Sequence, residues 1–227
     1  MGFAGVAFSI YSISHQQIQY QESARKYDKL RIIYEKSTNA SEQKNHHAEL
    51  LKLNKDYVGW IDISDTTINY PIVKGDDNNF YLSHNFYQDP DFAGAIFMDS
   101  QNSLKNLDKN TIIYGHNMKD KSMFGSLNNF LDQDFYENHK RFTLDTHLTE
   151  HTYTWDIFSV YETTNLNWMK TKFQSNDDFL SFLDSINKSS DIKTKTHIKE
   201  EDYILTLSTC TRSNSDERLI IHAKLIK

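Results

Sequence analysis

The sequence has little of three residues that shape many folds: one cysteine, two prolines and seven glycines among 227 residues. A single cysteine excludes an internal disulfide framework, and no cysteines and histidines have the spacing of a zinc site. With so few glycines and prolines, most loops must be built from Asn, Asp and Ser. Positive charge is not in excess either, because the formal net charge is −6. The chain therefore lacks the basic surface of a nucleic-acid-binding protein.

No part of the N-terminus has the length of a whole membrane span. Residues 2–13 are apolar, whereas a spanning helix needs roughly 20 such residues. A signal sequence carries positive charge before its apolar part, but the first Lys or Arg here is Arg25. Two interpretations remain: the outer end of a membrane anchor whose upstream residues are missing, or a short apolar tail on the helix that follows.

Two helices are expected before the first strand. Apolar residues at helical spacing predict a helix from His15 to Glu35, and Ser41 can cap a second helix running to about Lys55. The second helix contains His46 and His47. Because adjacent residues on a helix point apart, we interpret this pair as part of a solvated face and predict no metal there.

The rest of the chain reads as a mainly β domain. About eight segments have the pattern of strands, namely 57–63, 67–74, 93–98, 110–116, 142–145, 152–162, 203–210 and 217–226. Helices are expected between them, over 123–136 and from Ser175 onward, where Ser175 to Asp178 resembles a capping box. No β–α–β alternation runs through the chain, so the sheet should be closed or nearly so.

The last two strands carry the single cysteine. Because alternate residues of a strand share a face, Cys210 lies with Thr206 and Ser208, and Arg218 lies with His222. These are the less apolar faces of the two strands. If the strands are neighbours, the thiol and the guanidinium meet at one end of a sheet. A lone cysteine on a strand is also a common core residue, so this pattern alone leaves both interpretations open.

A second motif, TIIYGHNM at residues 111–118, lies upstream. The segment TLSTC at 206–210, with an arginine on the next strand, resembles the active-site signature of sortases. Sortases are cysteine transpeptidases that attach proteins to the cell wall of Gram-positive bacteria. YGHNM at 114–118, followed by SMF at 122–124, is similar to the histidine segment of the class B branch. The resemblance runs from about Tyr57 to the C-terminus.

The resemblance implies an eight-stranded sortase-type β-barrel with inserted helices and an N-terminal helical arm. It divides the chain into a residual, truncated membrane-anchor segment (1–14), the helical arm (15–56) and the catalytic domain (57–227). Class B sortases resemble type II membrane proteins, which favours the anchor interpretation of residues 2–13. The expected location is the extracellular face of the cell membrane, with a single-pass N-terminal anchor.

The resemblance also implies a reaction that uses no cofactor and no metal. Cys210 is the expected nucleophile, Arg218 the group that stabilises the oxyanion, and His116 the acid that protonates the leaving amine. The implied activity is cleavage after Thr of a sorting motif like Asn-Pro-x-Thr-Asn or x-Pro-x-Thr-Gly. The resulting thioacyl enzyme transfers the protein to an amine of peptidoglycan or its lipid-linked precursor. Arg212 competes for the arginine role, but we interpret it as a solvated loop charge.

Three residues match positions that line the substrate groove of class B enzymes: Asn78, Leu82 and Ser208. Asn78 is equally well explained as a turn former. Trp168 lies in the segment that usually walls the groove, but the identities there differ from the family's pattern. Thr211 likewise replaces an acidic residue sometimes found after the cysteine. The implied partners are surface proteins bearing a sorting signal, the wall amine and the membrane, with no nucleic acid.

Other assignments fit less well. An L,D-transpeptidase signature places Gly directly before the cysteine, where this chain has Thr209. A papain-like protease has its cysteine before its histidine, which is the reverse of the order here. The non-enzymatic alternative is a β-rich cell-surface binding or adhesion module with an incidental cysteine. That alternative predicts no reactivity at Cys210.

Overall fold

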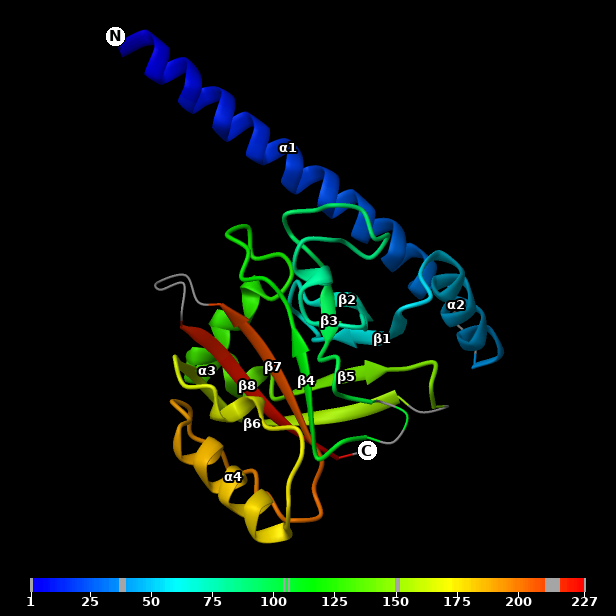
Figure 1. The fold of residues 1–227 in the computed structure, drawn as a ribbon, viewed down its shortest axis with the longest axis vertical. Helices are drawn as coiled ribbons and strands as arrows, with labels where there is room; N and C mark the ends of the chain where they lie inside the picture. Colours follow the sequence, from blue (N-terminus) through cyan, green and yellow to red (C-terminus); the bar gives the residue numbers. More distant parts are fainter. Residues whose placement is uncertain are drawn as a thin grey trace.

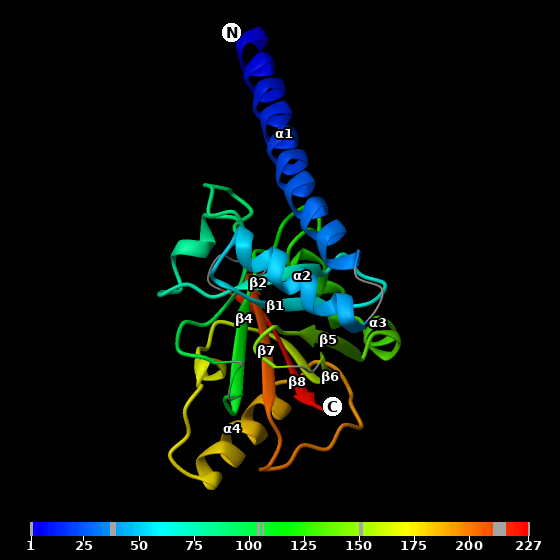
Figure 2. The ribbon, with the colours of Figure 1, turned by 90° about the vertical axis from the view of Figure 1, so that its right-hand side faces the viewer.

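A computed structural model describes residues 2–36, 40–103, 105, 107–149, 152–210 and 217–226. The N-terminal arm consists of two helices, α1 (Gly2–Glu35) and α2 (Ala40–Leu53). In Figure 1, α1 runs diagonally over one end of the molecule and its N-terminal half projects away from the rest. Figure 2 shows α2 beside β1 (Tyr57–Asp62), at the foot of α1.

The remainder of the chain is a closed barrel of eight strands in the order β1-β2-β3-β4-β7-β8-β6-β5. After β1, the strands are β2 (Asn69–Val73), β3 (Ile96–Met98), β4 (Asn110–Tyr114), β5 (Arg141–Asp145), β6 (Thr152–Thr163), β7 (Ile204–Cys210) and β8 (Arg218–Leu225). The β2–β3 and β4–β7 pairs are parallel and the other pairs are antiparallel. The predicted mainly β fold with eight strands is confirmed.

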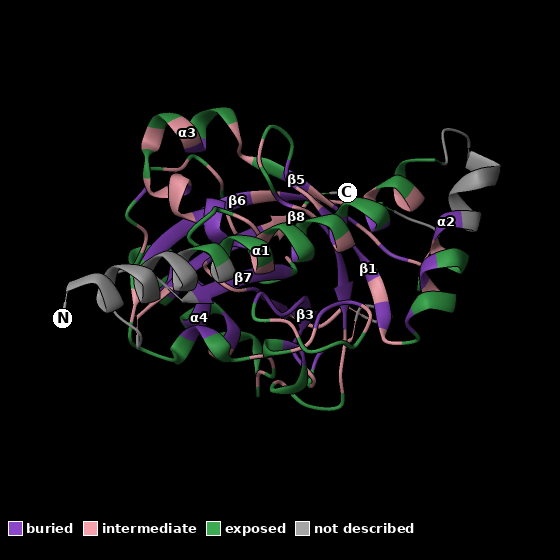
Figure 3. Cartoon of the chain, turned by 90° about the horizontal axis from the view of Figure 1, so that it is seen from above, coloured by how far each residue is buried: buried purple, intermediate pink, exposed green. Residues whose placement is uncertain are grey.

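Alternation along the strands explains which face of the sheet lines the inside of the barrel. The face of β7 and β8 that was expected to be apolar is fully buried inside the barrel, with Leu205, Leu207, Leu219, Ile221 and Ala223. Figure 3 shows the strands mainly in the colour of buried residues, with exposed residues on the outer sides of the helices. Burying branched apolar side chains stabilises the fold by roughly 1.5–3 kcal/mol each.

Helix α4 (Asn176–Lys188) covers part of the outer face of the barrel. Its apolar side, Phe179, Phe182, Leu183 and Ile186, packs against Phe158 and Ile204. The helix begins where the capping pattern predicts, because the Ser175 hydroxyl accepts a hydrogen bond from the Asp178 amide at 3.2 Å. The outer face of β7 is consequently buried as well, although its residues are mostly polar.

The single helix expected over 123–136 is divided in two. The 3₁₀ helix η2 (Gly125–Leu131) is followed by the short α3 (Gln133–Asn138). Between them Asp132 is extended, and its carboxylate accepts a hydrogen bond from the Phe135 amide at 2.8 Å. Because an aspartate competes for backbone N–H groups in this way, it starts a new helix here and ends the previous one.

The arm is held to the barrel by side chains on one stripe of α1. The Tyr27 hydroxyl donates to the Gly94 carbonyl at 2.7 Å, and the Tyr34 ring stacks on Trp60 with 4.2 Å between centroids. On α2, His46 is only 4% exposed. The interpretation of His46 as part of a solvated face is therefore wrong, because that side of α2 turns toward α1 and the barrel.

The predicted location is also wrong. We expected a single-pass N-terminal anchor that places the protein at the extracellular face of the membrane. Among the residues that the structure describes, which include α1 from Gly2 onward, none forms a helix that is both long and apolar enough to cross a membrane. The polar residues that follow residue 13 in α1 interrupt its apolar part.

Candidate active site

Three neighbouring strands bring the predicted catalytic residues to one end of the sheet. In the parallel β4–β7 pair, Tyr114 is level with Ser208, and the Gly115 amide donates to the Ser208 carbonyl at 3.2 Å. His116 and Cys210 each follow two residues beyond that pair. On the other side of β7, Cys210 is paired in register with Arg218 of β8. Figure 1 shows β4, β7 and β8 side by side, and Cys210 is the last residue of β7.

Backbone and side-chain contacts within the loop after β4 fix the position of the His116 backbone. The Phe124 amide donates to the His116 carbonyl at 3.0 Å, which closes the loop on itself. Phe124 and Met123 are buried under it. Gly115 is required for this packing, because a Cβ atom there would lie 2.7 Å from the Phe124 ring. These contacts explain why the histidine motif includes both the glycine and the Met-Phe pair.

His116 itself is half-buried. Burial lowers the pKa of its imidazole below the ordinary value, and a hydrogen bond with the Phe92 backbone opposes this shift only in part. The imidazole is therefore mainly neutral at neutral pH. A neutral imidazole can accept a proton from a thiol and pass it on.

A buried carboxylate supports the same end of the sheet. Asp99 is 3% exposed, and its Oδ2 accepts hydrogen bonds from the Tyr114 hydroxyl at 2.8 Å and from the Asn78 amide at 2.9 Å. Burial and the Asp99 charge raise the pKa of Tyr114, and the Arg218 charge lowers it. The Arg218 guanidinium is thus close enough to act electrostatically on this network. Asn78 also accepts a hydrogen bond from the Ser100 amide at 2.8 Å.

The other two predicted groove residues have opposite environments. Leu82 closes the 3₁₀ helix η1 (Phe80–Leu82) and is 43% exposed, so its side chain is open to a ligand. Ser208 is buried, and its hydroxyl has no hydrogen-bond partner among the described residues. It lies two residues before Cys210 in β7.

Comparison with known proteins decides the family. The family model for the sortase domain matches residues 61–226. A sortase B of Listeria monocytogenes is 39% identical over an aligned length of 226, and the match covers 96% of this chain and 91% of that protein. The chain belongs to the sortase family, in its class B branch. It is therefore a cysteine transpeptidase, and the alternative of a binding module with an incidental cysteine is set aside.

Solved structures agree with this assignment. Sortase B from Bacillus anthracis, in complex with AAEK1, is 42% identical with a TM-score of 0.85 over 92% of this chain and 99% of that one. The Staphylococcus aureus sortase B–substrate complex gives the same TM-score and coverage at 35% identity. The closed mixed barrel is thus the fold of class B sortases.

This sortase also has a buried polar network that the sequence analysis missed. His222 is fully buried beside Cys210's strand, and burial lowers the pKa of its imidazole to about 3. Its Nδ1 is 2.8 Å from the Thr206 hydroxyl and its Nε2 is 3.0 Å from the Tyr161 hydroxyl. Its burial and these two contacts give His222 a structural role in the barrel. Both ring nitrogens are satisfied by neutral partners, so the ring stays neutral.

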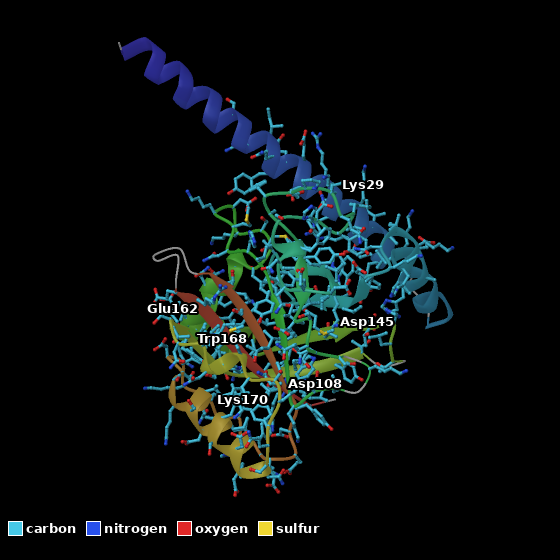
Figure 4. The ribbon with its side chains drawn as sticks, in the orientation of Figure 1. Lys29, Asp108, Asp145, Glu162, Trp168 and Lys170 are labelled. Carbon is cyan, nitrogen blue, oxygen red and sulfur yellow. The ribbon has the colours of Figure 1, made fainter. Side chains whose placement is uncertain are left out.

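The network continues through Asn110 to the segment that was expected to wall the substrate groove. The Asn110 Oδ1 accepts from the Thr206 hydroxyl at 2.6 Å. The Asn110 amide donates to the carbonyls of Trp168 at 3.1 Å and Lys170 at 2.9 Å. Figure 4 labels Trp168 and Lys170, the two residues whose carbonyls accept these hydrogen bonds. The sequence signal for this contact was a polar residue, Asn110, at the start of a buried strand.

Within the described side chains of the sortase, the group with separations suited to a metal ion is His46, His47 and Asp145, on the arm and β5. Figure 4 labels Asp145 on the side of the barrel below α2. This group is distinct from the strand ends that carry His116, Cys210 and Arg218.

Proposed function

We propose that this sortase cleaves a sorting signal after Thr and joins the released acyl group to an amine of peptidoglycan or its lipid-linked precursor. The observation that carries the proposal is the register of β4, β7 and β8, which brings His116, Cys210 and Arg218 to one end of three adjacent strands. The solved substrate complex of the Staphylococcus aureus sortase B supports a peptide substrate. The reaction class follows from the family, and the residue roles below are part of the proposal.

In the first step, the Cys210 thiolate attacks the carbonyl carbon of the substrate Thr. An ordinary cysteine has a pKa of about 8.5, so most of it is thiol at neutral pH. The neutral His116 accepts the thiol proton, and the positive charge of Arg218 favours the thiolate. A carbon–sulfur bond forms and the carbonyl π electrons move to oxygen. The product is a tetrahedral oxyanion.

Arg218 is the group that stabilises this oxyanion. A guanidinium gives charge-assisted hydrogen bonds to an anionic oxygen, and it stays protonated throughout the reaction. Its register position opposite Cys210 and its electrostatic effect on Tyr114 both support this role. Loss of one such donor costs on the order of 3 kcal/mol of transition-state stabilisation.

Collapse of the oxyanion breaks the carbon–nitrogen bond after Thr. The His116 imidazolium returns its proton to the departing amine, so the proton passes from the thiol to the leaving group. The thioacyl enzyme is then attacked by the acceptor amine, whose proton is taken by His116, and the Cys210 thiolate leaves. Attack by water at this stage would give hydrolysis.

We assign substrate contacts to Leu82, Ser208 and Asn78. Leu82 offers an exposed apolar side chain, and the hydroxyl of Ser208, two residues before Cys210, has no hydrogen-bond partner among the described residues. The side chain of Asn78 is held in place by Asp99, whose carboxylate also accepts a hydrogen bond from Tyr114. We also propose that residues 15–56 form a helical arm and that 57–227 form the catalytic domain, in keeping with a family match that starts at residue 61.

Mass spectrometry of the intact protein tests the proposal. The protein is incubated with two peptides, one carrying Asn-Pro-x-Thr-Asn and one carrying x-Pro-x-Thr-Gly. We expect a thioacyl adduct on Cys210 and a peptide cut after Thr for one of the two motifs. An added amine acceptor should divert the product from hydrolysis to ligation. Cleavage without any diversion would identify a protease, and cleavage by the C210A variant would overturn the mechanism.

A further inference from the structure

His46, His47 and Asp145 converge at the junction between the arm and the barrel. The Nε2 atoms of His46 and His47 lie 3.6 Å and 3.2 Å from the Asp145 Oδ2. One ligand atom from each of the three residues lies within 4.8 Å of the other two. The two histidines are adjacent on α2 and the aspartate ends β5, so only the docking of the arm brings these groups together.

The separations suit a tetrahedral metal ion. Bonds of about 2.0–2.1 Å from zinc to imidazole and carboxylate ligands put neighbouring ligand atoms about 3.3–3.4 Å apart. Both histidine–aspartate separations are within 0.3 Å of that range. The ligand atoms of the two imidazoles lie within 4.8 Å of each other, so a bound ion would draw them closer, and His47 is the more exposed of the pair.

His46 supplies an independent reason to expect a ligand. Its side chain is 4% exposed, and neither ring nitrogen has a hydrogen-bond partner within the described residues. A buried polar group without a partner destabilises the fold, so such groups are rare without a function. One nitrogen points into the cluster, where a metal ion would satisfy it.

The surrounding side chains resemble the outer shell of a metal site. The Tyr57 hydroxyl is 2.8 Å from the His47 Nδ1, which leaves the Nε2 atom of that ring to face Asp145. The Tyr34 hydroxyl donates to the Asp145 Oδ2 at 3.0 Å. Hydroxyl and carbonyl groups that fix the tautomer of a histidine and the orientation of a carboxylate commonly support metal ligands in this way.

We propose that His46, His47 and Asp145 bind a divalent transition-metal ion of the zinc class and that this ion fastens the arm to the barrel. Two imidazoles and one carboxylate favour zinc, copper or nickel over calcium and magnesium, which prefer oxygen ligands. Three protein ligands leave a fourth position for water. The ion joins α2 to β5, and Tyr34 of α1 completes the junction from the first helix.

The test measures metal content and thermal stability, so its outcome does not depend on the reaction proposed above. The full chain is prepared with Cys210→Ala, because the single thiol is itself a zinc ligand. After treatment with a chelator and dialysis against Zn²⁺, elemental analysis should find one zinc per chain. At a Zn²⁺ concentration 100 times Kd, the folded-to-unfolded ratio should rise about 100-fold, which corresponds to an increase in Tm of roughly 5–10 °C.

Variants on the same background locate the site. His46→Gln and Asp145→Asn should each remove the bound zinc and the increase in Tm, while His197→Gln, at an exposed histidine outside the cluster, should retain both. Tm without metal shows that each variant folds. Mg²⁺ should produce no comparable increase. Absence of bound zinc in the parent, or zinc binding that survives both substitutions, would overturn the proposal and leave the three residues as an ion-paired cluster.

Discussion

The catalytic end of the sheet and the arm–barrel junction both gather histidines with polar partners, but they are assembled in different ways. His116, Cys210 and Arg218 follow the backbone ladders of three strands, so hydrogen-bond register fixes their order. His46, His47 and Asp145 meet through the packing of helices on a barrel, and no backbone ladder links α2 to β5. The face on which each strand residue lies can be inferred from alternation along a sequence, whereas the pairing of distant strands and the docking of a helix cannot.

One buried histidine lies near the catalytic end and another in the arm–barrel junction, and their ring nitrogens differ in the hydrogen bonds that they make. Both ring nitrogens of His222 have hydroxyl partners, at 2.8 Å and 3.0 Å. His46 is similarly buried, yet neither of its nitrogens has a hydrogen-bond partner in the described part of the chain. A satisfied buried histidine stabilises the fold that it belongs to. An unsatisfied one destabilises it until a ligand arrives.

The largest effect is expected at the catalytic end. Cys210→Ala should abolish cleavage of a sorting peptide, because no other residue in the chain carries a thiol. Its Tm should stay within about 2 °C of the parent, since removal of one small side chain costs little. Peptide cleavage followed by liquid chromatography, together with a thermal melt, checks both. A variant that loses activity only because it unfolds would not support the assignment.

The next effect separates the two arginines near the cysteine. Arg218→Ala should lower kcat/KM by about 10²–10³-fold, as expected for the loss of an oxyanion donor. Arg212 lies outside the residues that the structure describes. If it is the solvated loop charge that the sequence indicates, Arg212→Ala is the matched control and should change kcat/KM by less than about threefold. Steady-state kinetics with the preferred peptide measure both. The opposite ranking would assign the oxyanion contact to Arg212.

The pH dependence of stability should reveal His222. Its pKa is about 3 in the folded protein and 6.5 ordinarily, so between these values the unfolded chain binds a proton that the folded protein does not. Stability is therefore lost as pH falls below about 6.5, by up to about 1.4 kcal/mol per pH unit. Urea unfolding at pH 7, 6 and 5 should show a steeper loss for the parent than for His222→Gln. Parallel curves would contradict the burial of a neutral imidazole.

The smallest effect is expected at His46 without metal. His46→Leu should change the free energy of unfolding by less than about 1 kcal/mol, and in either direction, because it removes a polar group that has no partner. Peptide cleavage should be unchanged. Urea unfolding of chelator-treated protein measures the free energy of unfolding. His222→Leu is the comparison, and its free energy of unfolding should fall by about 1–3 kcal/mol. A large loss at His46 would mean that its ring already has a favourable partner.

Much of the barrel could be predicted from local patterns. The eight segments with strand character correspond to the eight strands, and Ser175 caps α4 as its sequence indicates. Asp132 shows where a prediction from helical spacing fails. Apolar residues recur at helical spacing through the whole segment, but the Asp132 side chain accepts a backbone hydrogen bond and divides the segment into two helices. The predicted roles of Cys210, His116, Arg218, Asn78, Leu82 and Ser208 remain predictions.

The sequence by itself determined the strand pattern, the alternation that puts Cys210 and Arg218 on matching faces, and the motifs that indicate a sortase. These depend on near neighbours along the chain. Only the tertiary structure decided that β4 lies parallel to β7, which brings His116 to the same end as Cys210, and that α2 buries His46 against Asp145. Both depend on contacts between segments far apart in sequence, and such contacts are fixed by the packing of the whole barrel rather than by local preference.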